Sequence, residues 1–83
     1  MTRAKDSLHE LEAKLSRLSD DERPSHKGID LINGVGWMLI PMDIRRAYVL
    51  FAEAGAHAEA TDYKLGIARA RFGYAYRDFF TAD

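Results

Sequence analysis

"GIDLINGVGWMLIPMD", residues 28–43, decides the fold of this chain, because it can be read in two incompatible ways. Asn33-Gly34 between two apolar runs is typical of the turn in a β-hairpin. The same residues can instead form a buried helix that ends near Pro41, since proline interrupts a helix. The first structure makes a small mixed fold, and the second makes an all-helical one.

Local preferences leave both structures open. A hairpin would pair residues 29–32 with residues 35–38, and a two-stranded ribbon of this kind is only marginally stable unless helices cover it. It would also place Gly36 inside a strand, where glycine is unfavourable. In a helix, Gly34 and Gly36 would permit close approach of a neighbouring helix, at a cost of roughly 1 kcal/mol each relative to alanine.

Length and composition indicate one small globular domain spanning residues 1–83. The chain is 47% hydrophobic and 30% charged, which is typical of a water-soluble protein. Twelve basic residues against thirteen acidic ones give a net charge of −1. Net charge therefore provides no general attraction to nucleic acid or to an anionic membrane.

The sequence has no cysteine and no apolar segment typical of a signal peptide or a membrane span, which restricts both the chemistry of any site and the expected location of the protein. The chain has no cysteine, which excludes disulfides and thiolate metal sites. Its N-terminal residues are charged where a signal peptide needs an apolar core. The longest mostly apolar run, residues 35–42, is far shorter than the roughly 20 residues that span a bilayer. We therefore expect a cytoplasmic protein with no membrane contact.

Residues 2–18 have the clearest helical pattern. Leucines recur at steps of three, four and three on one narrow stripe, called here the leucine seam: Leu8, Leu11, Leu15 and Leu18. Ser7 followed by Glu10 fits a capping box, although the helix can also begin at Thr2. Such a seam packs either on the chain's own core, which we favour, or on another chain.

Residues 19–28 interrupt this pattern. They are polar and contain Pro24 and Gly28, so we expect an exposed linker.

Helical periodicity returns at Asp43, a suitable N-cap residue. One apolar face follows, comprising Ile44, Ala47, Tyr48, Phe51, Ala54 and Ala58. Gly55 weakens the end of this segment without proving a break.

A last helix is expected to begin with Thr61 or Asp62 as its cap. It carries two apolar stripes, one of Tyr63, Ile67, Ala70 and Tyr74, and one of Leu65, Ala68, Phe72 and Phe79. A helix with two apolar faces should be sandwiched between neighbours.

The order of large and small residues from Leu31 onward forms a recognisable series. The first helix of the series carries spaced large and small residues and ends in a short turn at residues 40–43. The second helix then carries a small residue, an aromatic residue and another small residue at steps of four and three. These residues are Leu31, Gly34, Val35 and Met38, then Ala47, Phe51 and Ala54. The series resembles tetratricopeptide-type helical hairpins, and Leu65-Gly66 with Gly73 resembles the start of a second, incomplete unit.

A second resemblance rests on three short motifs. Gly36-Trp37, the run at residues 45–47 (Arg-Arg-Ala) and Leu50-Phe51 are similar in spacing to the small helical chaperones of bacterial type III secretion. Both resemblances imply packed helices over residues 29–80 that bind a partner without catalysis. A plain helical bundle remains the alternative to an incomplete repeat array.

Candidate catalytic and metal-binding residues are sparse. His57 lies four residues after Glu53, with Glu59 nearby, but a metal site would need further ligands. No serine lies in a strand-to-helix turn that would expose a nucleophile. "NGVG" lacks the third glycine and the lysine of a phosphate-binding loop. We expect no enzyme activity, no metal and no cofactor.

Basic residues alternate with aromatic ones in the C-terminal segment, an arrangement that can track phosphates and stack bases. The basic residues are Lys64, Arg69, Arg71 and Arg77. On a helix their charge divides between two sides, and the chain as a whole is nearly neutral. Nucleic-acid binding is therefore an alternative function and not the leading one.

The sequence thus predicts an all-α domain that acts as a non-catalytic adaptor, chaperone or inhibitor of a partner protein. Its contacts would come from the leucine seam, if that seam is not used internally, and from large aromatic residues and arginine. The second group comprises Trp37, Tyr74, Tyr76 and Arg77. A self-associating helical dimer is the remaining alternative.

Overall fold

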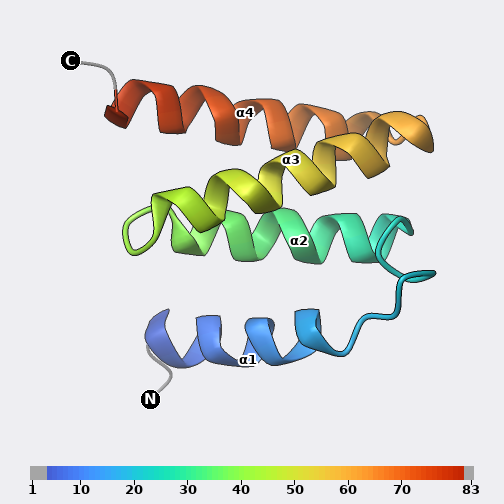
Figure 1. Cartoon of the computed structure of the whole chain (residues 1–83), viewed down its shortest axis with the longest axis horizontal. Coiled ribbons are helices and arrows are strands. Elements are labelled where there is room, and N and C mark those ends of the chain that lie inside the picture. Colours follow the sequence, from blue (N-terminus) through green and yellow to red (C-terminus); the bar gives the residue numbers. More distant parts are fainter. Residues whose placement is uncertain (1–3, 82–83) are drawn as a thin grey trace.

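A computed structural model describes residues 4–81, with side chains at residues 7–76 and at Asp78. These residues form four helices: α1 (Ala4–Ser16), α2 (His26–Leu39), α3 (Ile44–Ala60) and α4 (Lys64–Thr81). Figure 1 shows consecutive helices running in opposite directions, with α1 and α4 at opposite edges. The chain measures 34 × 33 × 18 Å, so it is a flat body. The all-α class predicted from the sequence is confirmed.

Asn33-Gly34 lies inside α2, so the hairpin alternative is wrong. The Ser25 side chain accepts a hydrogen bond from the Gly28 amide at 3.0 Å and thereby caps the start of α2. The helix ends at Leu39, and Pro41 lies in the short turn before α3. The predicted linker over residues 19–28 is correspondingly too long, because residues 26–28 form the first turn of α2.

The side chain of Phe51, on α3, is fully buried between two glycines of other helices. A Cβ atom built at Gly36 of α2 would lie 2.8 Å from Phe51 Cε1, and one at Gly73 of α4 would lie 2.6 Å from Cε2. Only glycine leaves room for the ring at these positions. Gly36 therefore has the predicted close approach, whereas a Cβ at Gly34 would meet nothing within 4 Å.

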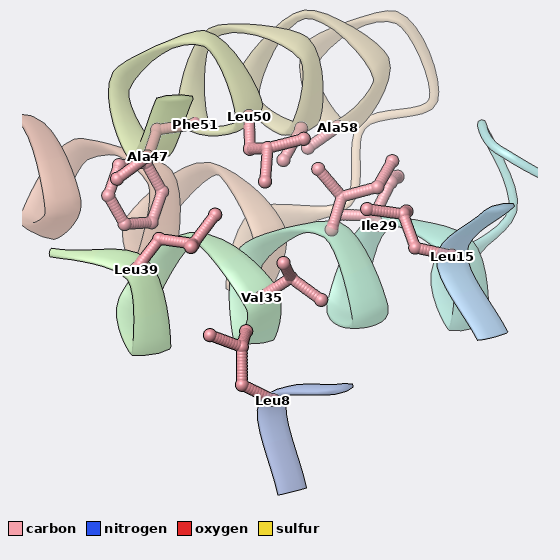
Figure 2. Packing of buried hydrophobic residues seen from close by; sticks show 11 residues of the cluster. Leu8, Leu15, Ile29, Val35, Leu39, Ala47, Leu50, Phe51 and Ala58 are labelled. Atoms are coloured by element: carbon pink, nitrogen blue, oxygen red, sulfur yellow. The ribbon is translucent and has the colours of Figure 1, made fainter. Parts of the chain in front are cut away.

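The buried core joins all four helices, with α2 at its centre. Helix α2 packs against each of the others, whereas α1 packs mainly against α2 and is joined to α3 by an ion pair between Glu12 and Arg46. Figure 2 shows Leu8 and Leu15 pointing from α1 toward α2, with Phe51 near Leu39 on the α3 side. The apolar face predicted for α3 is buried at Ala47, Phe51, Ala54 and Ala58.

Several expected helix ends differ in the structure. Asp43 does cap α3, accepting a hydrogen bond from the Arg46 amide at 3.1 Å. Ser7 does not cap α1, because the helix already includes Ala4. Thr61 closes α3 instead of opening α4, and Asp62 makes the turn with a positive φ of 54°. Gly55 does not interrupt α3.

One of the two apolar stripes predicted on α4 remains on the surface. The buried side of α4 is built from Gly66, Ala70 and Gly73. Leu65, Ala68 and Phe72 are exposed, so the prediction that α4 is sandwiched is wrong within the described chain. The reason is that α4 lies at an edge and no described helix covers its outer side.

The linker is held to α3 by a two-point ion pair. Arg23 Nε and Nη2 donate to the two carboxylate oxygens of Glu53 at 2.5 and 2.7 Å. His57, one turn further along α3, lies 3.1 Å from the same carboxylate. The hydrogen bond from Arg23 holds the pKa of the Glu53 carboxyl below its usual value, against the opposing effect of partial burial, and His57 adds to the lowering.

We expect Gly73→Ala to lower the free energy of unfolding by about 1–2 kcal/mol, because the new methyl group would overlap the buried Phe51 ring. Gly34→Ala is the matched control and should raise it by about 0.5–1 kcal/mol, since its methyl group meets open space in a helix. Urea unfolding followed by circular dichroism measures both. Equal effects of the two substitutions would contradict the packing described for Phe51.

Glu53→Gln should lower stability at neutral pH and have progressively less effect in acid. Because the folded pKa of Glu53 lies below the unfolded value of about 4.3, its ionised form stabilises the fold above that value. This contribution is lost as the pH falls through the folded pKa. Unfolding midpoints of the wild type and the variant should therefore converge below about pH 4. Glu59→Gln, at an exposed site on the same helix, is the matched control and should leave the unfolding midpoint at neutral pH close to that of the wild type.

Candidate functional site

The leucine seam divides into a buried half and an accessible half. Leu8 and Leu15 are buried in the core against α2, so they are not available to a partner. A contact role was expected of them only if the seam is not used internally, and these two leucines are used internally. Leu11 and Leu18 are only partly buried and line a groove between α1 and α2 together with Leu31.

A cluster of aromatic side chains reaches the surface where α2 meets α4. The Trp37 ring lies 5.9 Å from the buried Phe51 ring and 5.7 Å from Phe72, and it meets Tyr76 edge-on at 5.2 Å. Phe72 is 64% exposed. Trp37, Ala68, Phe72 and Tyr76 are called the aromatic face below. Two of the predicted contact residues, Trp37 and Tyr76, therefore lie beside Phe72. The sequence instead predicts that Phe72 is covered by a neighbouring helix.

The aromatic face contains a shallow hollow of about 300 Å³. Trp37, Ala68 and Phe72 line it together with Arg69. Arg69 Nη1 donates to the Asp30 carboxylate at 3.3 Å, which ties its guanidinium to α2. The hollow is therefore mostly apolar, with one cation at its border.

Asp30 is also the acceptor for Tyr63, whose hydroxyl donates to both carboxylate oxygens at 2.8 and 3.0 Å. This hydrogen bond raises the pKa of the Tyr63 hydroxyl. The ring of His26 stacks on the Tyr63 ring with centroids 3.9 Å apart. Sequence reasoning missed this network, because Asp30 and Tyr63 are 33 positions apart and no local pattern pairs them.

Of the remaining predicted contact residues, the one whose side chain is described, Tyr74, does not join the aromatic face. Tyr74 lies on another side of α4, where its ring meets Tyr48 edge-on at 5.0 Å. The side chains of Arg77 and Phe79 lie outside the described residues, so their predicted positions are not tested.

The basic residues of the nucleic-acid alternative are partly neutralised. Lys64 pairs with Asp62 at 3.3 Å, and Arg69 pairs with Asp30 at the same distance. Arg71 is exposed. The described cations of α4 therefore do not form a continuous positive surface.

The described residues contain no group of three or more His, Asp or Glu side chains arranged to hold a metal ion. Within that part of the chain, His57 and Glu53 meet each other, and Arg23 completes the contacts of that carboxylate. This cluster joins the linker to α3.

No known protein family, curated protein or solved structure matches the chain. The resemblance to tetratricopeptide hairpins therefore stays a prediction. Within residues 4–81, no helix combines the length and the apolar character needed to cross a bilayer.

We expect Phe72→Ser to change the free energy of unfolding by less than about 1 kcal/mol, because most of this side chain is already in water. Leu15→Ala should cost about 2–4 kcal/mol, since it opens a cavity between α1 and α2. Thermal unfolding of both variants tests this division. A large loss of stability in Phe72→Ser would show that Phe72 belongs to the core and not to a surface site.

Proposed function

We propose that this chain is a non-catalytic protein-binding domain, acting as a small adaptor, chaperone or inhibitor through its aromatic face. One observation carries the proposal: Phe72 is 64% exposed while in ring contact with Trp37. Folded monomers rarely leave clustered large apolar groups uncovered unless something binds there. Tryptophan, tyrosine and arginine are also the residue types that most often anchor protein interfaces.

The packing beneath the aromatic face supports this function. Trp37 contacts Phe51, and Phe51 is fixed between Gly36 and Gly73, so the exposed rings rest on the rigid core. A surface held in place before binding loses little conformational entropy when a partner arrives. The hollow of about 300 Å³ beside Phe72 suits an apolar side chain of that partner.

The alternatives have less support from the observed contacts. Nucleic-acid binding needs free cations along one surface, and Lys64 and Arg69 are engaged by Asp62 and Asp30. Self-association would use the same residues of the aromatic face as binding of a different protein, so an experiment has to distinguish the two. The polar cluster of Arg23, Glu53 and His57 has a structural explanation, because it holds the linker to α3.

Affinity capture with the tagged full chain tests the proposal. Wild type, Phe72→Ser and Val49→Ser are compared in extracts of the source cells by quantitative mass spectrometry. Val49 is the matched control, because it is 61% exposed on α3 and does not line the hollow. We expect one or more proteins to be retained by wild type and Val49→Ser and lost, by about tenfold or more, with Phe72→Ser.

Two outcomes would contradict this use of the aromatic face. In the first, Phe72→Ser and Val49→Ser retain the same proteins as the wild type. In the second, light scattering shows a wild-type dimer that Phe72→Ser converts to a monomer, which assigns the aromatic face to self-association.

A further inference from the structure

The accessible half of the leucine seam lines a second, chemically different groove. This groove has a volume of about 450 Å³ and lies between the end of α1, the linker and the start of α2. Leu11 and Leu18 face it from the α1 side, and Leu31 faces it from α2. None of its lining residues belongs to the aromatic face.

Positive charge is concentrated at the rim of this groove. Lys14, Arg17 and Lys27 are exposed among its lining residues, against one carboxylate, that of Glu22. Glu22 is already engaged, because its Oε1 accepts a hydrogen bond from the Ser19 amide at 2.8 Å. This hydrogen bond is also the main reason why the pKa of Glu22 is lowered, and the positive charge of Lys27 adds to the lowering. A chain with a net charge of −1 thus carries a local excess of cations around an apolar floor.

The cations occupy both walls of the groove. Lys14 and Arg17 belong to the α1 side, and Lys27 belongs to the first turn of α2. A fatty acid has one carboxylate at one end, which would match cations gathered at one end of a pocket. Cations on both sides of a leucine floor instead match a ligand with an apolar stripe flanked on both sides by carboxylates. An acidic amphipathic helix has that arrangement.

We infer that the groove lined by Leu11, Leu18 and Leu31 is a docking site for an acidic amphipathic helix of a partner protein. Large apolar side chains of that helix occupy the groove, and its Asp or Glu side chains meet Lys14 and Arg17 on one wall and Lys27 on the other. The volume of about 450 Å³ accommodates more than one leucine-sized side chain. This inference does not depend on the aromatic face.

The test uses a fluorescein-labelled synthetic peptide whose helix has leucines at i, i+3 and i+7 with glutamates on both flanks. Binding to the full chain is measured by fluorescence anisotropy at low and raised salt. A peptide with every glutamate changed to glutamine serves as the neutral comparison. We expect saturable binding of the acidic peptide that weakens with salt, and binding of the neutral peptide weaker by about tenfold.

Two triple variants with the same change in net charge locate the site. Lys14→Gln, Arg17→Gln, Lys27→Gln should weaken binding of the acidic peptide by about tenfold. Arg45→Gln, Lys64→Gln, Arg71→Gln removes three exposed cations that do not line the groove and should leave binding unchanged. Circular dichroism checks that both variants remain helical. Leu31→Ala should weaken binding of both peptides, because it shortens the apolar floor.

Four results would overturn the inference. The first is no saturable binding of the acidic peptide, and the second is an equal loss of binding in the two triple variants. The third is loss of binding on Phe72→Ser. The fourth is displacement of the labelled peptide by laurate at a lower concentration than the unlabelled peptide requires for the same displacement. The third result would move the peptide to the aromatic face, and the fourth would identify the groove as a fatty-acid site. The capture experiment on Phe72 measures retained cellular proteins and does not use the peptide, so the two proposals fail separately.

Discussion

The seating of the Phe51 ring between Gly36 and Gly73 is the contact on which the rest of the structure depends. Through it, one side chain of α3 meets α2 and α4 at the same time. Each of the two glycines costs roughly 1 kcal/mol of helix stability relative to alanine. Their lack of a side chain lets the three helices approach closely around a fully buried ring. Trp37 then packs on that ring from outside, with Phe72 and Tyr76 beyond it. The aromatic face is thus the outer end of the core.

The flat arrangement explains why two different surfaces remain open. Helix α2 has neighbours on several sides, whereas α1 and α4 lie at the edges and each has an uncovered side (Figure 1). On α4 the uncovered side carries aromatic residues, with Phe72 the most exposed. On α1, Leu11 and Leu18 lie beside Lys14 and Arg17 in the groove that this helix forms with α2. The two edges differ in charge and in side-chain type, so they suit partners of different chemistry.

Local signals predicted elements well where one short-range interaction dominates. Asp43 caps α3 as expected, because an N-cap bond joins residues three positions apart. Asn33-Gly34 left the choice between turn and helix open, because its preference for a hairpin turn is local and the contact that holds it in a helix is not. Here Asn33 is buried in α2, and its side-chain amide donates to the Gly66 carbonyl of α4 at 3.3 Å. That partner is 33 positions away, beyond the reach of any local pattern.

The amino-acid pattern alone placed the leucine seam, the apolar face of α3 and the two stripes of α4, since steps of three and four define helix faces. It left residues 28–43 open between a helix and a hairpin. Tertiary structure alone decided which faces are covered. It buried Leu15 and left Leu18 partly open, covered Ala70 and exposed Phe72, and joined Asp30 to Arg69. The physical reason is that periodicity gives the direction of a side chain relative to its own helix. Which helices lie beside it depends on contacts between residues distant in the chain.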